Sequence, residues 1–285
     1  MRLSVFDILS PVYVPRLLPE LDLFGYHRFW ATEHHTPTQS ASPTLVACLA
    51  AAMTARMRVG TAGILINYAC PAKVAEDFRL LELYFSGRID LGVSGASILN
   101  DQLYLDGRSP LGRASYAKRV RTLVDLVRGN HDVVLGPIGS TRPALWLCGA
   151  SVASAVLAGE LGMYFACHNR GTPEDSPRTV IAAYRAAYDG DDAPCSVIAA
   201  HGVCAETEQA ARRQWSNPSA PPCFAGTPEA CVEQLAALVS GCGADEAVIH
   251  LHVHDIDARI VGYGLLAEAA GLAIERAVDT AANAS

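Results

Sequence analysis

The sequence predicts an α/β fold, a (β/α)8 TIM barrel of parallel strands with outer helices, in a single domain over residues 1–285. Short apolar segments alternate with helical patterns along the chain, and this order is typical of a parallel sheet covered by helices. With 285 residues and 51% hydrophobic content the chain can bury a large core, and α/β barrels of this length fold as one domain. Eight such strands close most simply into a barrel.

The predicted strands are short apolar runs bounded by polar or turn residues. They span residues 3–9, 28–32, 58–66, 89–93, 144–148, 164–167, 197–203 and 247–252. No internal repeat, low-complexity tract or linker separates them. The strands are therefore expected to belong to one continuous barrel.

Two segments between these strands carry readable helical patterns. Pro71 suits a first helical position, and Val74, Phe78, Leu81 and Phe85 follow at helical spacing, which predicts a helix over 71–85 that covers the barrel. Segment 43–55 is apolar nearly all round, so it is expected to lie deeply buried or at a subunit contact. A homodimer or a heterodimer with a paralogous chain is expected from this second helix.

Two long connections, residues 96–112 and 216–226, interrupt the alternation with Gly, Ser, Asp and Pro. Long connections in compact domains are often binding loops or lids, although exposed spacers have the same composition. Both readings stay open for these segments.

Charge, hydropathy and cysteine usage exclude several classes of protein. The net charge is −7, from 22 basic and 29 acidic residues, and no basic stripe is present to follow a nucleic acid backbone. The longest apolar window, 43–53, is too short for a membrane span, and the first residues lack a leader pattern. The nine cysteines form no Cys-x-x-Cys pair, so most are expected to be small core residues. A cytoplasmic protein with neither a nucleic acid nor a membrane partner is predicted.

The most informative motif is Glu33-His34-His35, directly after the predicted strand 28–32. In a parallel barrel the chemistry lies at the carboxyl ends of the strands, and imidazole and carboxylate groups transfer protons near neutral pH. The motif therefore predicts an enzyme. Taken alone, such a cluster is also explained by hydrogen bonding between a strand end and its loop.

Several segments in order along the chain resemble the bacterial luciferase-like flavin monooxygenases. They are GYHRFWATEHH at 25–35, RVGTAG at 58–63, PAKVAED at 71–77, GRIDLGV at 87–93, LCGAS at 147–151 and GTPE at 226–229. The resemblance implies a barrel that binds reduced FMN, or in some relatives the deazaflavin F420, at the carboxyl ends of its strands. It further implies a flavin reductase as partner, and oxidation of a small organic substrate with reduced flavin and O2.

The resemblance also assigns roles to residues at two strand ends. His34 matches the family histidine tied to oxidation chemistry and is the expected catalytic base, with Glu33 and His35 orienting its ring. Thr61, Ala62 and Gly63 fall where the family backbone approaches the flavin ring, and small residues there let a planar ring come close. A close-packed strand or a bulge would carry the same small residues.

A phosphate site is expected where segment 149–154 ends one strand and opens a helix. Free amides and the positive end of a helix dipole attract an anion, and Ser151 and Ser154 lie three residues apart in the first turn. Gly149, Ser151 and Ser154 are therefore the expected phosphate-binding residues. Serine is also an ordinary helix cap, which is the alternative reading.

The chain departs from the family pattern in two places. Where flavin-binding relatives place a phosphate-binding arginine, this chain has Ser94 followed by Gly95, so the guanidinium is missing and Ser94 is left as a cofactor-binding candidate. Arg170 and Arg113 are the candidate substitutes. The region before Gly226 is also expected to be shorter than in relatives, which would leave the cover of the flavin incomplete.

These departures leave other functions open. One is an accessory, non-catalytic luciferase-like protein that stores flavin or partners an active paralogue. Another is a barrel recruited to flavin-independent chemistry with His34 and His35 as acid and base. A third is a metal-dependent hydrolase, since His250, His252 and His254 alternate along a strand. No second His-x-His motif accompanies this last set near the first strand, so no metal site is expected.

Overall fold

Eight parallel strands close into a barrel in the computed structural model, which describes residues 1–8, 11–98, 113–169, 172, 174–215 and 221–272. In spatial order the barrel strands are β1 (Arg2–Asp7), β2 (Arg28–Ala31), β3 (Arg58–Thr61), β5 (Ile89–Ser94), β6 (Ala144–Gly149), β7 (Tyr164–His168), β8 (Ser196–Cys204) and β10 (Glu246–Leu251). The barrel closes because β10 pairs with both β1 and β8. The predicted (β/α)8 barrel is confirmed.

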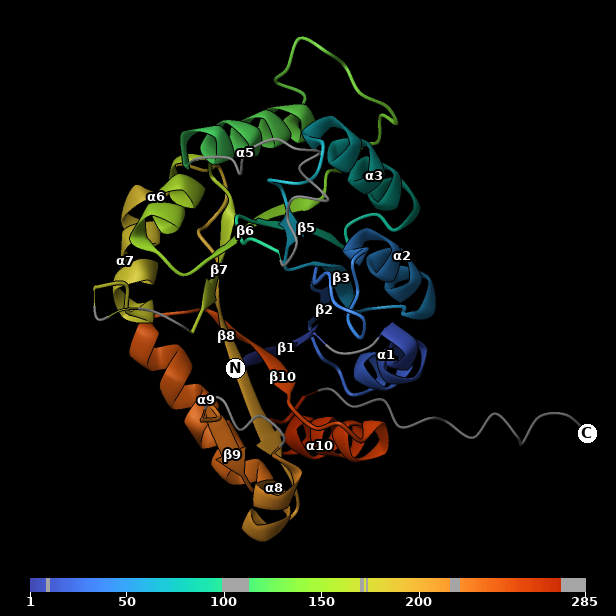
Figure 1. The fold of residues 1–285 in the computed structure, drawn as a ribbon, viewed down its shortest axis with the longest axis vertical. Coiled ribbons are helices and arrows are strands. Elements are labelled where there is room, and N and C mark those ends of the chain that lie inside the picture. Colours follow the sequence, from blue (N-terminus) through green and yellow to red (C-terminus); the bar gives the residue numbers. More distant parts are fainter. Residues whose placement is uncertain (9–10, 99–112, 170–171, 173, 216–220, 273–285) are drawn as a thin grey trace, which may run out of the picture.

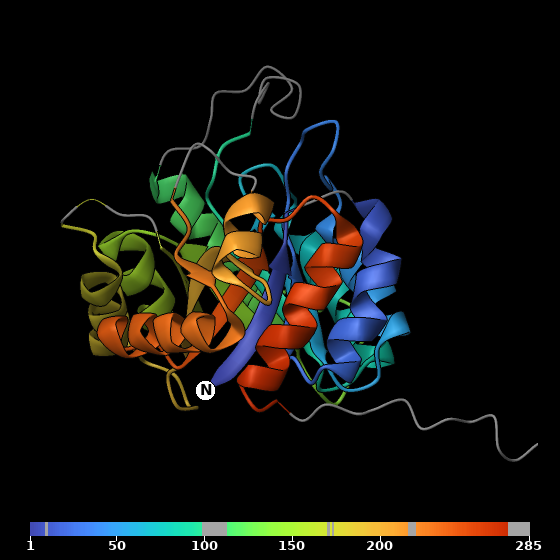
Figure 2. The same cartoon turned by 90° about the horizontal axis from the view of Figure 1, so that it is seen from below.

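Helices surround the strands as an outer ring (Figure 1). They are α1 (Val14–Leu23), α2 (Pro43–Met53), α3 (Pro71–Tyr84), α5 (Arg113–Arg128), α6 (Val152–Glu160), α7 (Pro177–Ala187), α9 (Pro228–Cys242) and α10 (Ile256–Ala269), with a 3-10 turn at Pro11–Tyr13. Five of them begin with Pro at the first or second position, where the missing N–H is not needed. The last helix, α10, packs beside α1 and completes the ring (Figure 2).

The predicted strand over 58–66 is wrong in its continuity, because the structure breaks it into β3 and β4 (Ile64–Leu65). Gly60 is in register with Asp90 of β5, whereas Ile64 is in register with Val93. One side of the ladder therefore holds one more residue than the other, which interrupts the pairing. The intervening residues, Ala62 and Gly63, are joined by a cis peptide bond and reach the mouth of the barrel.

A second departure lies between β8 and α9. There the chain forms the short helix α8 (Glu208–Gln214) and the strand β9 (Phe224–Gly226), which pairs with the end of β8. Neither element was expected from the sequence, because each is too short to show the hydrophobic periodicity of a helix or a strand. Residues 216–220 of this connection and 99–112 of the other long connection lie outside the described residues.

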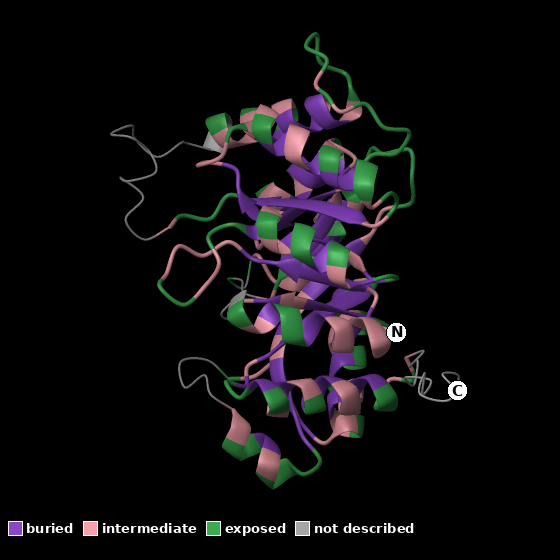
Figure 3. Ribbon diagram, turned by 90° about the vertical axis from the view of Figure 1, so that its right-hand side faces the viewer, coloured by how far each residue is buried: buried purple, intermediate pink, exposed green. Residues whose placement is uncertain are grey.

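Two layers of apolar side chains make up the core. The larger layer lies between the strands and the helices, and the smaller fills the barrel around Trp30 and Trp146, whose rings are 4.9 Å apart. Figure 3 shows the strands buried and the outward turns of the helices exposed. Small cysteines belong to this core, since five of the nine are buried, and all nine are free thiols.

The amino-terminal end of the barrel is closed by buried charges. The Arg28 guanidinium donates to Glu246 through Nε (2.8 Å) and to Asp90 through Nη1 (2.6 Å). Asp90 also accepts from Arg58 Nη2 at 2.6 Å and from Trp30 Nε1 at 2.9 Å. Burial raises the pKa of Asp90, but the two arginines outweigh it and hold that pKa below its usual value.

Within the described part of the chain, no helix is long and apolar enough to cross a membrane.

Candidate active site

A cavity of about 240 Å³ opens at the carboxyl ends of the barrel strands. Its floor is made by barrel-interior side chains, among them Trp30, Ala166 and Val248. The expected residues His34 and Glu33 line it after β2, which places them where the barrel fold positions its chemistry.

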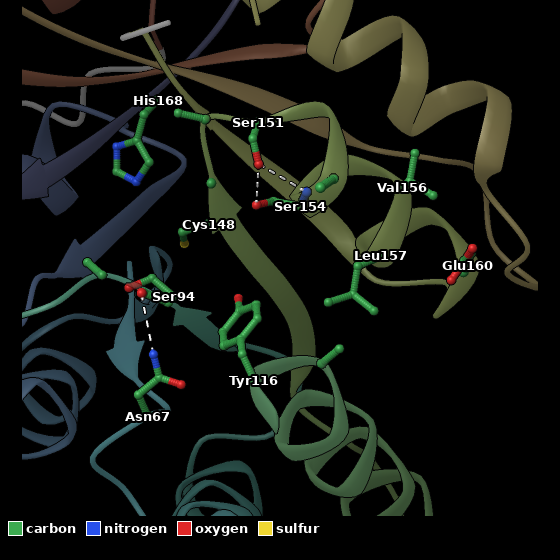
Figure 4. Close-up of a pocket in the computed structure, with 16 residues that line it drawn as sticks. Asn67, Ser94, Tyr116, Cys148, Ser151, Ser154, Val156, Leu157, Glu160 and His168 are labelled. Atoms are coloured by element: carbon green, nitrogen blue, oxygen red, sulfur yellow. Dashed lines mark hydrogen bonds between the residues drawn. The ribbon is translucent and has the colours of Figure 1, made fainter. Parts of the chain in front are cut away.

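A second cavity, of about 620 Å³, adjoins the first beside α5 and α6. It is shown in Figure 4, where Ser151 and Ser154 lie at the start of α6. The two cavities share four lining residues: Ser94, Ala96, Cys148 and His168. Ser94 therefore stands between a compartment that contains His34 and one that contains the two serine hydroxyls.

The ring of His34 is held by Thr32, a site residue that the sequence pattern does not reveal. The hydroxyl of Thr32 donates its one proton to the carbonyl oxygen of Asp7 at 2.9 Å. The contact of 3.1 Å between Thr32 Oγ1 and His34 Nδ1 therefore has the imidazole N–H as donor. In the neutral ring this tautomer leaves Nε2 as a proton acceptor.

Glu33 and His35 form a pair next to His34. His35 Nε2 lies 2.8 Å from Glu33 Oε1, and the other carboxylate oxygen accepts from the backbone N–H of Leu65 at 2.9 Å. The carboxylate thereby ties the loop after β2 to β4. The orienting role expected for Glu33 and His35 stays a prediction, and the contact described here gives Thr32 a direct part in it.

The small residues after β3 take different places. Ala62 and Gly63 line the first cavity. Thr61 is fully buried, with its hydroxyl donating to the carbonyl of Gly92 at 2.9 Å, so its side chain bridges β3 to β5 and lines neither cavity. Strand alternation turns the Thr61 side chain away from the mouth, and the cofactor-binding role expected for residues 61–63 stays a prediction.

Ser151 and Ser154 lie together at the amino end of α6, as the sequence predicts. Their hydroxyl oxygens are 2.9 Å apart, and the Ser154 N–H donates to Ser151 Oγ at 3.2 Å, so Ser151 is also the helix cap. Gly149 packs closely here, because a Cβ at that position would lie 2.7 Å from the Cβ of Ser154. The Val152 N–H already donates to Asp175 Oδ1 at 2.8 Å, which places a carboxylate at this helix end.

Tyr116 stands over Gly95 in the second cavity. A Cβ at residue 95 would lie 3.0 Å from Tyr116 Cε2, so the ring of α5 fills the space that a longer side chain at 95 would need. Figure 4 shows Tyr116 directed into the cavity. Among the described lining residues of this cavity there is no Lys or Arg. Arg170 and the side chain of Arg113, the expected substitutes, lie outside the described part.

Further imidazoles line the first cavity, from strands that the sequence did not connect with His34. They are His168 on β7, His201 on β8 and His252 just after β10. The ring of Trp215, at the end of α8, stacks on His201 with centroids 5.9 Å apart and contacts His252 at 5.5 Å. Burial lowers the pKa of His252, and the neighbouring His254 lowers it further.

The histidines of segment 250–255 differ in their surroundings. His250 is fully buried, and burial holds its pKa well below the usual value, with Arg259 adding to the effect. His254 is exposed, and Asp255 caps α10 by accepting from the Ala258 N–H at 2.8 Å. In the described ranges no group of three or more His, Cys, Asp or Glu side chains is placed to hold a metal ion.

Comparison with known proteins identifies relatives over most of the chain. The model of the luciferase-like monooxygenase family matches residues 9–222. The uncharacterized protein YwcH of Bacillus subtilis (strain 168) is 34% identical over 66% of this chain and 60% of its own length. The N-acetyl-S-alkylcysteine monooxygenase of the same organism is 32% identical over 50% of this chain and 46% of its own length. The chain thus spans 60% or less of the length of these curated relatives.

Solved structures share the fold over nearly all of this chain. Apo-MsnO8 has a TM-score of 0.86 at 28% identity and covers 96% of this chain and 99% of its own. The oxygenating constituent of 3,6-diketocamphane monooxygenase from Pseudomonas putida, solved with FMN, has a TM-score of 0.75 at 16% identity, covering 95% and 97%. An F420-dependent secondary alcohol dehydrogenase has a TM-score of 0.74 at 15% identity and covers 94% of this chain and 98% of its own. With its closed barrel and its family match, the chain belongs to the luciferase-like monooxygenases.

Proposed function

We propose that the chain is a flavin-dependent monooxygenase that oxidises a small organic substrate with O2. The observation that carries the proposal is the pair of adjoining cavities, one next to His34 and the other next to Ser151 and Ser154. A flavin has a planar ring and a phosphorylated tail, and these need an open apolar floor and an anion site. Fold neighbours that carry FMN or use F420 support this cofactor class.

The residues present fit the ring of a flavin better than they fit its phosphate. Ala62 and Gly63 offer a small-residue surface for the ring, and the serine hydroxyls at the start of α6 can donate to phosphate oxygens. The carboxylate of Asp175 at the same helix end works against a dianion, and no described lining residue supplies a cation. We therefore propose that reduced FMN is held weakly and arrives from a separate flavin reductase; F420 is the alternative cofactor.

His34 is the proposed base. Its Nδ1–H is fixed on Thr32, so Nε2 is the nitrogen that accepts a proton from the substrate. Bound reduced flavin supplies the electrons that activate dioxygen. Trp30, Ala166 and Val248 keep water from the floor of the cavity, and Glu33 ties the loop that carries His34 to β4.

Anaerobic titration with reduced FMN tests the cofactor, and turnover with a flavin reductase present tests the reaction. Saturable binding is expected, and His34→Ala should lower turnover of a thioether or aldehyde probe by about a hundredfold or more, because a positioned base contributes that much. The matched control is His131→Ala, an exposed imidazole in the loop after α5. Absence of flavin binding, or full turnover in His34→Ala, would contradict the proposal.

An accessory role is the second candidate, and Asp175 with the cation-free described lining of the second cavity favours it. Such a chain would store flavin or complete the site of a paralogue. It predicts flavin binding with no turnover by the isolated chain, and turnover on adding the active partner. Turnover by the isolated chain that is lost in His34→Ala eliminates it.

We further propose a dimer through α2 and α3. On α2, Leu45 is 71% exposed and Leu49 lies one turn on, while on α3 Leu83 and Tyr84 are exposed, Tyr84 by 68%. Figure 3 views this side of the barrel. Light scattering after size-exclusion chromatography should give a dimer mass, and Leu45→Asp with Leu49→Asp should give a monomer because charges would be buried at the contact. Val134→Asp, at another exposed apolar residue, should leave the mass unchanged.

A further inference from the structure

The mouth of the barrel has two chemically different walls. The strand order places β8 across the barrel from β3, β7 across from β2, and β10 across from β5. Ala62, Gly63 and Ser94 therefore lie on one side. The other side, here called the imidazole wall, consists of His168, His201 and His252.

Two rings of the imidazole wall, those of His201 and His252, are held in place before any ligand arrives. Trp215 lies against His201 with an interplanar angle of 18° and against His252 at 59°. His201 Nδ1 is 3.6 Å from Cys223 Sγ, which in turn accepts from Asn169 Nδ2 at 3.3 Å. Fixed rings lose little side-chain entropy when they bind a ligand, so the wall is suited to recognition.

The described lining of the first cavity carries little negative charge that would repel an anion. Glu33 is the only acidic residue among the described lining residues, and its oxygens are engaged by His35 and Leu65. His252 faces His250 and His254 on its own segment and His201 on β8, with Arg259 of α10 nearby.

One carboxylate behind this wall is already engaged. Asp7 of β1 lies 3.3 Å from Arg259 Nη1 and 3.6 Å from His250 Nδ1. A negative oxygen placed against the imidazoles would thus meet ring N–H donors, while the Asp7 carboxylate behind them is balanced by the Arg259 guanidinium.

We propose that the imidazole wall binds a carboxylate of the organic substrate, so that the oxidised part of the substrate is turned toward the opposite side of the mouth. The inference deepens the proposed function by naming its substrate class, an organic acid. It assigns specificity to His252 and His168, and to Trp215 the positioning of the rings.

The test compares benzoate with benzamide, which has nearly the same shape but no charge, by isothermal titration calorimetry on the flavin-free protein. Benzoate should bind about tenfold more tightly, the difference expected for a charge-assisted hydrogen bond in a partly buried site. His252→Gln and His168→Gln should each remove most of that preference. His131→Gln is the control, because that imidazole is exposed in the loop after α5 and does not line the cavity.

Equal binding of benzoate and benzamide, or an unchanged preference in both glutamine variants, would overturn the inference. Thermal melting checks that each variant is folded, and His168, at the exposed end of its strand, keeps the test valid should His252→Gln fail to fold. The titration contains no flavin. A protein that binds benzoate but not reduced FMN would therefore overturn the proposed function and leave the anion-binding wall standing.

Discussion

The two ends of the barrel interior are built from the same strands but differ in chemistry. At the amino-terminal end, Arg28, Asp90 and Glu246 are buried and bonded to one another, with Arg58 completing the set. At the carboxyl-terminal end, imidazoles and small residues surround a cavity. The closed end has its charges matched in pairs, whereas the described lining of the open end has several imidazoles and one carboxylate, that of Glu33.

This difference shows how one fold separates stability from chemistry. The Arg28 guanidinium also lies 4.7 Å above the ring of Trp146, so the network is packed as well as paired. Substituting one residue of such a network leaves its partners buried with unpaired charges, and this destabilises the fold. Substituting a residue at the mouth changes ligand binding or the reaction rate instead, because water can fill the space that its side chain leaves.

The largest effect is expected from breaking the closed end with Arg28→Met. Asp90 and Glu246 would keep their charges without their main partner, so the free energy of unfolding should fall by about 3–5 kcal/mol. Urea unfolding measures this. Arg121→Met, which removes an exposed pair with Glu160, is the control and should change stability by less than about 1 kcal/mol. Equal losses of stability in both variants would show that the buried network stabilises the fold no more than an exposed ion pair does.

A pH effect should separate the buried His250 from the exposed imidazoles. Its folded-state pKa lies well below the unfolded value, so between these two pKa values the unfolded chain binds more protons. Stability should therefore fall as the pH drops below about 6.5, by at most about 1.4 kcal/mol per pH unit from this group.

Urea unfolding of His250→Gln across pH 7 to 5 measures that contribution. The variant should show a shallower loss than the unmodified chain, because its amide does not titrate. His131→Gln, in the exposed loop after α5, should keep the original slope. The same slope in all three proteins would refute the role given to burial.

At the open end, Thr32→Val should reduce turnover by about tenfold, since one orienting hydrogen bond to His34 is lost. The KM should change little, and Thr32→Ser should restore the rate because it returns the hydroxyl. Steady-state kinetics of the three proteins separates orientation from packing. A Val variant with full activity would remove Thr32 from the mechanism.

The smallest effect is expected in the second cavity. Ser154→Ala should weaken FMN binding by roughly threefold to tenfold, the range for one neutral hydrogen bond, and should leave riboflavin binding unchanged. Fluorescence titration with both flavins gives the two affinities. A matched loss for riboflavin would place Ser154 away from the phosphate.

Some of the site is visible in the sequence because its signals are local. Ser151 and Ser154 follow from helix spacing and a cap pattern, and the structure places both hydroxyls 2.9 Å apart. His34 follows from its place after a strand. The break between β3 and β4 was not expected, because it depends on one extra residue relative to β5 and no hydrophobic periodicity within segment 58–66 reveals it.

The sequence by itself determined the alternation of strands and helices, and with it the barrel, because apolar spacing along the chain dictates which faces must be buried. Only the tertiary structure decided which distant groups share a cavity. His252 and His34 meet at one mouth because β10 pairs with β1 and closes the sheet. The position of Trp215 against His201 likewise depends on packing between β8 and the short helix α8. Such contacts join residues far apart along the chain, and local spacing carries no information about them.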